Sequence, residues 1–79
     1  MQNQIIWIEV LAANVRRRRQ AFRLSQEELA HRVGVDVRYL GGIERQQENP
    51  SLKVIVALAD ALGTTPTKLL DTAELGRSA

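Results

Sequence analysis

Arginine side chains offer the most distinctive chemistry in this sequence, and they are concentrated in its first 45 residues. This part holds eight arginines and five acidic residues, a balance of +3, whereas residues 46–79 hold three basic and four acidic residues, a balance of −1. The planar guanidinium group binds phosphate oxygens and the edge of guanine through paired hydrogen bonds. This distribution favours nucleic acid as a partner, and a solvated, charged helix face is the alternative.

Two of these arginines flank a pair of adjacent glycines in the segment RYLGGIER, residues 38–45. At about 100° per residue, a helix over this segment has an outward side made of Arg38, Gly42 and Arg45. Glycine costs about 0.8–1 kcal/mol relative to alanine inside a helix. A helix that enters the major groove needs donors for base edges and room for close approach. We therefore expect Gly42 to give clearance for DNA, and a tight crossing of helices or subunits is the alternative.

Short helices must position this face, and their ends carry local signals. Ser25 with Glu28 forms a capping box, Asp36 and Ser51 are good N-caps, and Thr65 precedes a proline at a first helical position. Glycines follow two predicted helix ends. With the apolar stripes, these signals predict helices over about 4–22, 26–33, 37–45, 52–62 and 66–73.

The chain is predicted to be one all-α domain over 1–79, with its core over about 11–70 and a frayed tail over 75–79. The longest apolar run, Ile5-Ile6-Trp7-Ile8, is far shorter than the roughly 20 residues needed to cross a bilayer. We expect a soluble, cytoplasmic protein without a membrane segment. We also expect this run to pack on the core or on a partner, and a disordered arm is the alternative.

Residues suited to catalysis or metal binding are few and scattered. His31 is the only histidine, and the absence of cysteine excludes disulfides and thiolate metal sites and suits a reducing compartment. The adjacent Glu27 and Glu28 point in different directions on a helix, where capping and the helix dipole explain them. The sequence also lacks a glycine-rich phosphate loop. We expect no enzyme activity, no metal and no cofactor.

The segment LSQEELAHRVGVDVRYLGGIERQQENPSL resembles the helix-turn-helix signature of phage repressors, Cro-type proteins and small bacterial regulators of the XRE type. Within it, DVRYLGGIER is similar to the recognition segment of restriction-modification controller proteins. The resemblance covers about residues 11–70. It implies a compact five-helix, lambda-repressor-like domain, with the helix-turn-helix over about 25–45 in the second and third helices. It also implies a homodimeric transcriptional regulator that binds a pseudo-palindromic operator on double-stranded DNA.

The resemblance also implies roles for individual residues. Those expected to face DNA bases are Val37, Arg38 and Gly42. Those expected to contact the DNA backbone are Gln26, Tyr39, Arg45, Ser51 and Lys53. Arg19 and Glu44 match an ion pair that joins the first helix to the recognition helix. Since helical periodicity independently places Glu44 on the inward side, its carboxylate needs a partner, and two solvated side chains are the alternative.

Two positions depart from the family pattern. Arg23 stands where glycine usually ends the first helix, and Gln46 replaces the glycine that usually follows IER, which bears on the path of the next loop. The dimer surface is expected at Leu69, Leu70 and Ala73, with help from the fourth helix. The alternative is that the two leucines only close the core, which at least one of them must do.

A different function on the same fold is an antitoxin-like or partner-dependent interaction module. No small-molecule effector is evident in the sequence. The residues do not reveal the operator, the target genes, or the choice between repressor and activator.

Overall fold

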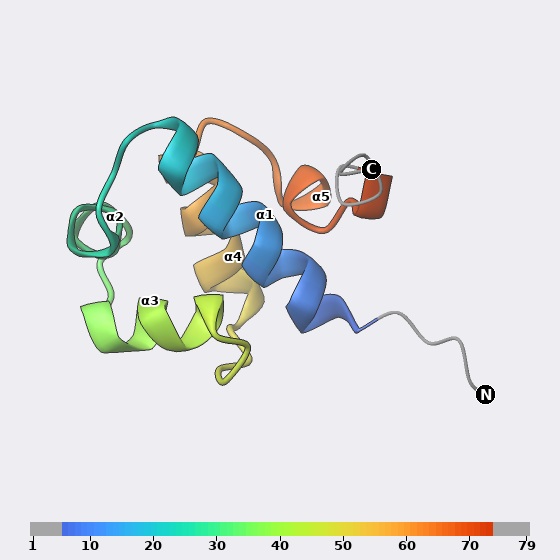
Figure 1. Ribbon diagram of the computed structural model, residues 1–79, viewed down its shortest axis with the longest axis horizontal. Helices are drawn as coiled ribbons and strands as arrows, with labels where there is room; N and C mark the ends of the chain where they lie inside the picture. The colour runs from blue at the N-terminus through green and yellow to red at the C-terminus, as the bar shows by residue number, and fades with distance from the viewer. Residues whose placement is uncertain (1–5, 74–79) are drawn as a thin grey trace.

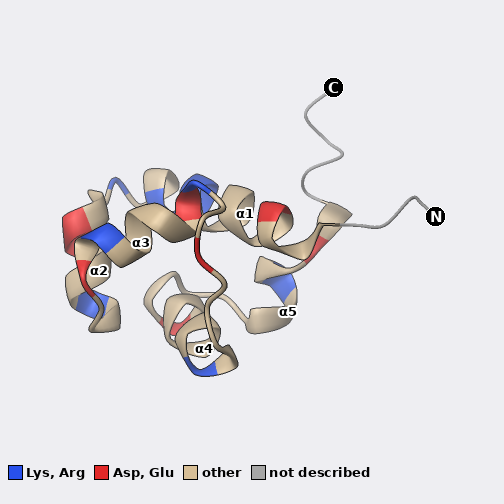
Figure 2. Ribbon diagram, turned by 90° about the horizontal axis from the view of Figure 1, so that it is seen from below, with Lys and Arg blue, Asp and Glu red and all other residues tan. Residues whose placement is uncertain are grey.

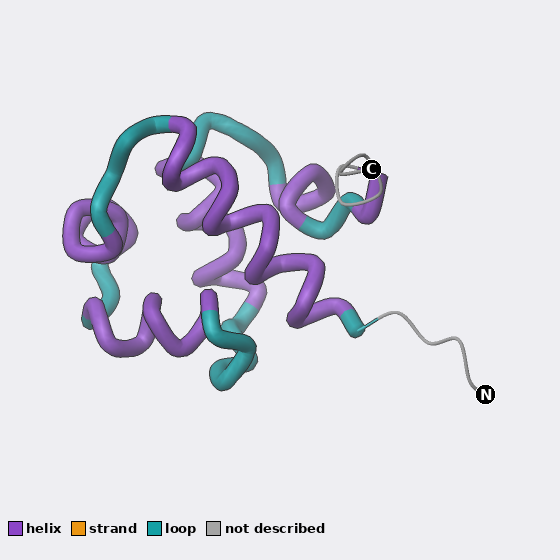
Figure 3. Tube along the Cα trace, in the orientation of Figure 1, coloured by secondary structure: helices purple, strands orange, loops and turns teal. Residues whose placement is uncertain are grey.

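The computed structural model describes residues 6–73, whose helices enclose one core (Figure 1). Their bounds are α1 Trp7–Ala21, α2 Gln26–Val33, α3 Val37–Glu44, α4 Leu52–Ala61 and α5 Pro66–Leu69. Within this described part there is no strand (Figure 3). The predicted all-α class and the order of the five helices are confirmed.

Aliphatic side chains from every helix form the core. Each of its largest apolar members is completely buried: Val15, Leu29, Leu40, Ile43, Leu58, Leu62 and Leu69. The long α1 packs against α3 and α5, while α2 packs against both α3 and α4. Burying these side chains contributes about 1.5–3 kcal/mol for each leucine or isoleucine. The core therefore holds the short helices in place, since helices this short are not stable in isolation.

The helix-turn-helix is built by the local signals predicted for it. Ser25 Oγ accepts from the backbone N–H of Glu28 at 3.0 Å, and the Glu28 carboxylate accepts from the Ser25 N–H at 2.8 Å. Gly34 ends α2 in the left-handed region, at φ 86°. Asp36 Oδ1 then accepts from the Arg38 N–H at 2.7 Å and starts α3. The turn between the two helices is thus only residues 34–36 long.

The ends of α1 and α5 differ from the prediction. The first helix begins at Trp7, with Ile6 as its N-cap, rather than near Gln4, which lies outside the described residues. Ile6 and Trp7 are more than half exposed, so this part of the apolar run 5–8 does not pack on the core. Ile5 and the predicted tail 75–79 also lie outside the described residues.

Helix α5 ends at Leu69 instead of about Ala73, and a distant side chain binds the backbone at and after this end. Asn14 on α1 is fully buried, and its Nδ2 donates to the Leu69 carbonyl at 2.8 Å and to the Asp71 carbonyl at 3.1 Å. The Ala73 N–H, which a continued helix would pair with the Leu69 carbonyl, bonds instead to Oδ1 of Asp71 at 2.8 Å. Asn14 therefore closes the C-terminal segment onto α1.

One residue of the predicted dimer surface is misplaced. Leu69 is completely buried in the core, so it cannot contact a second subunit, and its assignment to that surface is wrong. Leu70 is partly buried and Ala73 is exposed. Helical spacing alone did not show which of the two adjacent leucines points inward.

Two helices end with a non-glycine residue in the left-handed region. Arg23 has φ 59° and Gln46 has φ 66°. After α1, the N–H groups of Arg23 and Leu24 bond to the carbonyls of Gln20 and Arg19. The same pattern follows α3, and both are Schellman motifs. The chain therefore keeps the turns that glycine would favour, although a side chain in this region costs about 1–2 kcal/mol.

A buried carboxylate joins α1, α2 and α3. Glu44 is only 3% exposed, and the Arg19 guanidinium binds it through two bonds, Nε to Oε2 at 2.7 Å and Nη2 to Oε1 at 3.1 Å. Gln26 Nε2 also donates to Oε1, at 2.9 Å, and Arg16 Nε lies 3.6 Å from it. The expected ion pair of Arg19 and Glu44 is thus present, with Gln26 as an additional donor and Arg16 as a second nearby charge.

These contacts decide the ionisation of Glu44. Burial by itself raises the pKa of the carboxyl, but hydrogen bonds from Arg19 and Gln26 and the charges of Arg19 and Arg16 outweigh it. The pKa of Glu44 is therefore below its ordinary value. The carboxylate is charged at neutral pH and is fully compensated by its donors.

Replacing Gln46 by glycine is expected to stabilise the fold, because glycine adopts φ 66° without the steric cost of a Cβ. Part of the gain is lost to the greater freedom of glycine in the unfolded chain. The expected net gain is about 0.5–1 kcal/mol, a rise in Tm of about 2–8 °C in thermal unfolding. Gln46→Ala is the control, since it removes the same side chain but keeps the Cβ. Equal Tm values for the two variants would contradict this explanation.

Glu44→Gln is expected to destabilise the protein by about 3–5 kcal/mol at neutral pH, because it leaves the Arg19 charge buried without its counter-ion. Since folding lowers the pKa of Glu44, its contribution is complete above the ordinary value of 4.5 and is lost as the pH falls through the folded-state pKa. The difference between wild type and variant should therefore shrink below pH 4.5 in urea unfolding. The exposed Glu27→Gln should change stability by less than about 1 kcal/mol. A difference that does not depend on pH would refute a role for the Glu44 charge.

Candidate nucleic-acid interface

The N-terminal end of α3 presents a highly accessible arginine of the predicted face. The Arg38 side chain is 89% exposed, and among residues 6–73 its guanidinium bonds to the neighbouring Asp36, Nε to Oδ1 at 3.2 Å and Nη2 to Oδ2 at 3.3 Å. The hydrogen bonds and charge of Arg38 hold the pKa of Asp36 below its ordinary range, and Asp36 raises the pKa of Arg38. Both groups are therefore charged at neutral pH. Arg38 is placed to meet a ligand outside the protein.

The middle of α3 is less open than predicted. Gly42 is buried, and a Cβ added there would lie 2.6 Å from Cγ of Glu48, in the loop after α3. The prediction that Gly42 leaves a free gap for DNA is therefore wrong in this structure, because the Glu48 side chain fills that gap. A Cβ on Gly41 would lie 2.9 Å from Nη1 of Arg45 and 3.5 Å from Oε1 of Gln26. The pair of glycines thus admits side chains of the same protein.

Two further residues of α3 are only partly available. Val37 and Tyr39 are both half-buried, and both pack against the hydrophobic core. Each can therefore offer a ligand only the exposed part of its side chain. Packing against the core fixes the positions of both side chains.

The residues expected at the DNA backbone come from the starts of α2 and α4 and from the end of α3. Gln26 keeps one Nε2 proton after its bond to Glu44, and the Ser51 hydroxyl, which accepts from the Val54 N–H at 3.3 Å, keeps its proton to donate. Arg45 is exposed, with Nε donating to Gln47 at 3.1 Å, and Lys53 is exposed as well. All four retain donors suited to phosphate oxygens. Figure 2 shows basic positions on all these helices, with acidic positions between them.

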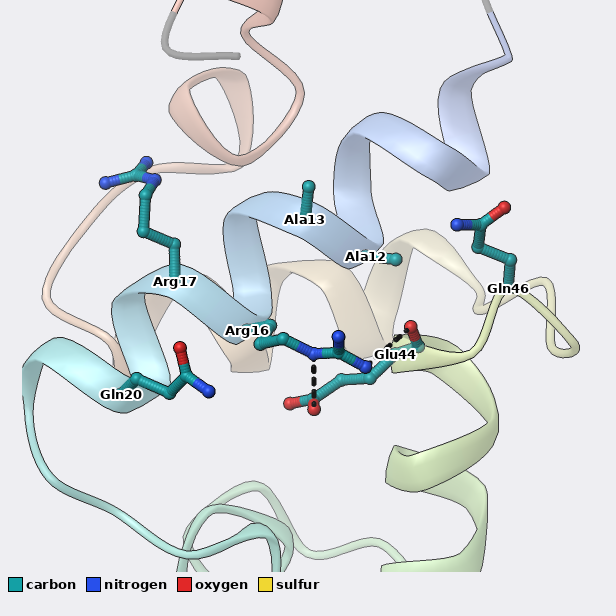
Figure 4. Close-up of a pocket in the computed structure, with 7 residues that line it drawn as sticks. All are labelled: Ala12, Ala13, Arg16, Arg17, Gln20, Glu44 and Gln46. Atoms are coloured by element: carbon teal, nitrogen blue, oxygen red, sulfur yellow. Dashed lines mark hydrogen bonds and ion pairs between the residues drawn. The ribbon is translucent and has the colours of Figure 1, made fainter. Parts of the chain in front are cut away.

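An open recess of about 250 Å³ lies between α1 and the C-terminal end of α3 (Figure 4). Its lining includes Arg16, Arg17, Gln20, Glu44 and Gln46. Arg16 crosses it to reach the Glu44 carboxylate and, at 3.5 Å, the Glu44 carbonyl. The recess is therefore bridged by the contacts that hold α3 on α1.

The residues the structure describes hold no group of three or more histidine, aspartate or glutamate side chains that would suit a metal ion. None of the helices in residues 6–73 is long and apolar enough to span a bilayer. Asn14, Asp36 and Glu48 were not singled out as site or core residues from sequence. Asp36 carried only its helix-cap signal, and nothing in the sequence placed Glu48 over Gly42.

Comparisons with known proteins agree with this architecture. The helix-turn-helix family HTH_3 matches residues 15–69. Control protein C.SmaI from Serratia marcescens is 45% identical over 62 residues, which are 78% of this chain and 74% of that protein. The crystal structure of the restriction-modification controller protein C.AhdI from Aeromonas hydrophila superposes with a TM-score of 0.75 at 44% identity, covering 78% of this chain and 94% of that one.

A hypothetical transcription factor from Neisseria has a TM-score of 0.84 and 37% identity, covering 90% of this chain and 82% of that one. The match to the family extends over well over half of the chain and includes both helices of the motif. Members of this family are DNA-binding transcription regulators and not enzymes. The chain belongs to the XRE-type helix-turn-helix family of transcriptional regulators and is similar to restriction-modification controller proteins.

Proposed function

We propose that this protein is a sequence-specific regulator that binds a pseudo-palindromic operator as a homodimer, in the manner of a restriction-modification controller. The observation that carries the proposal is the exposed Arg38 guanidinium at the start of a helix that the Glu44 contacts fix to α1 and α2. A rigid recognition helix with an accessible arginine can carry its donors into the major groove with little reorganisation.

Base recognition is proposed for the N-terminal half of α3. Arg38 binds the O6 and N7 acceptors of guanine, and the exposed part of Val37 contacts a thymine methyl group. Gly42 meets a base only if the Glu48 side chain leaves its present position. We therefore expect Arg38 to contribute more discrimination than Gly42.

Residues around α3 that retain hydrogen-bond donors are proposed to contact the DNA backbone and set the position of the protein on the duplex. Gln26, Arg45, Ser51 and Lys53 donate to phosphate oxygens, and Tyr39 does so through its hydroxyl. Because such contacts carry no sequence information, they supply affinity that falls as salt rises. The carboxylate of Glu44 accepts a hydrogen bond from the Gln26 amide and so orients it for its proposed phosphate contact.

A second copy of the chain is proposed to cover the apolar surface around α4. Leu52 is 70% exposed and Val56 is 40% exposed, although both are apolar. A groove of about 160 Å³ next to α4 is lined by Trp7, Ile55 and Leu70 among others. The proposed surface omits the buried Leu69 and includes Leu70, and the exposed Ala73 remains part of the predicted dimer interface. An exposed apolar surface of this kind is typical of an interface.

A partner-dependent module, such as an antitoxin, is the second candidate. The same apolar surface favours it, since it can accept a different protein instead of a second copy. It requires no base discrimination by Arg38. Sequence selection from DNA therefore separates the two candidates.

Arg38→Ala should relax the preferred base at one position of each half-site and weaken operator binding by about 1–3 kcal/mol, because it removes a paired bond to guanine. The measurement is selection of bound duplexes from a random pool, followed by titration of the selected site. Arg32→Ala, which removes an equal charge from the exposed end of α2, should leave the preferred bases unchanged. Enrichment of no sequence by the wild type, with binding that only fades with salt, would favour the partner-dependent module.

Leu52→Glu should convert the protein from dimer to monomer at micromolar concentration in sedimentation equilibrium, because it places a charge at the most exposed apolar side chain of the proposed interface. Its fold should persist, since Leu52 is exposed and glutamate suits the first turn of α4. Phe22→Glu, at another exposed apolar position, should remain dimeric. A wild type that is only monomeric under these conditions would defeat the proposed dimer.

A further inference from the structure

We propose that Asp36 determines base specificity by holding the guanidinium of Arg38 in the orientation that reads guanine. This inference rests on the proposed DNA-binding function and adds a positioning residue to it. Asp36 was expected from sequence only as the N-cap of α3. In the structure its carboxylate also binds the side chain of the residue proposed to read a base.

The Asp36 carboxylate bonds to both the backbone and the side chain of Arg38. Its Oδ1 accepts from the backbone N–H of Arg38 at 2.7 Å, which fixes the carboxylate to the first turn of α3. The same carboxylate accepts from Nε of Arg38 at 3.2 Å and from Nη2 at 3.3 Å. The helix terminus therefore fixes the carboxylate, and the carboxylate fixes the guanidinium plane.

The bonds to Asp36 leave one particular edge of Arg38 available. A guanidinium has a side edge, made of Nε–H and one Nη2–H, and an end edge, made of two parallel N–H groups on Nη1 and Nη2. Asp36 occupies the side edge. The end edge matches the two acceptors of guanine, whereas adenine presents one acceptor and one donor. The orientation thus selects guanine over adenine.

Exposure explains why this pair acts in recognition rather than in folding. Side chains that are 89% and 55% exposed form a salt bridge that adds little stability in water. In a DNA groove, where water is displaced, charge-assisted bonds are stronger and a carboxylate without its partner is costly. A complex in which Arg38 turns toward a phosphate or a wrong base would leave Asp36 unpaired beside the negative duplex. Asp36 therefore penalises incorrect complexes more than the correct one.

Asp36→Asn tests this role while preserving the helix cap. Asparagine is as good an N-cap as aspartate, and its Oδ1 can still accept from the Arg38 N–H. Its Nδ2 is a donor in place of Oδ2, so the second bond to the guanidinium is lost together with the charge. Thermal unfolding should show a Tm within about 2 °C of the wild type. Glu27→Gln is the matched control, because it removes an exposed carboxylate from α2 that does not bind Arg38.

Duplex selection with each variant gives the decisive readout. In Asp36→Asn the preference for guanine at the position read by Arg38 should fall about 5–10-fold, while affinity for random-sequence DNA should rise a few-fold. Glu27→Gln should keep the wild-type preference. In an Arg38→Ala background, Asp36→Asn should have no further effect on base preference, since the guanidinium it orients is absent.

The outcomes are distinguishable. An unchanged guanine preference in Asp36→Asn, with or without tighter binding to all sequences, would overturn the inference and leave Asp36 as a helix cap only. A selected site in the wild type that does not depend on Arg38 would overturn it too, although the regulator function would stand. If the wild type selects no sequence, the proposed function fails and this inference fails with it.

Discussion

The buried carboxylate of Glu44 is the constraint on which the helix-turn-helix depends. A charge without solvent must be compensated, and here the hydrogen-bond donors are Arg19 on α1 and Gln26 on α2, with the charge of Arg16 on α1 close by. Because these directional bonds link three helices, α3 cannot rotate or slide without breaking them. The start of α2 and the recognition helix therefore move as one body, although the two helices are only eight residues each.

The surface of α3 divides into two halves with different properties. At its N-terminal end, Asp36 and Arg38 are exposed and bond mainly to each other. Further along, side chains of Glu48, Arg45 and Gln26 cover the glycine pair. The glycines permit this covering because a Cβ at residue 42 would collide with Glu48 and a Cβ at residue 41 with Arg45. Stability given up inside the helix thus allows the loop after α3 and the side chain of Arg45 to pack closely on it.

Closure of the domain depends on a contact between distant parts of the chain. Asn14 and Leu69 are 55 residues apart, yet the Asn14 amide binds the Leu69 carbonyl inside the core. A buried amide requires such partners, since an unsatisfied one costs about 1–3 kcal/mol. The contact brings the short α5 against α1 and buries Leu69. The apolar side chains of Leu52 and Val56 on α4 remain exposed at the surface.

The sequence by itself determined the helices, the turn and the inward direction of Glu44. Ser25, Gly34 and Asp36 act on backbone groups no more than four or five residues away, and helical periodicity orients neighbouring side chains. Only the tertiary structure decided the partners of Asn14, the burial of Leu69 and the covering of Gly42 by Glu48. These features depend on which elements pack against each other in space. Local propensity and residue spacing do not specify that packing.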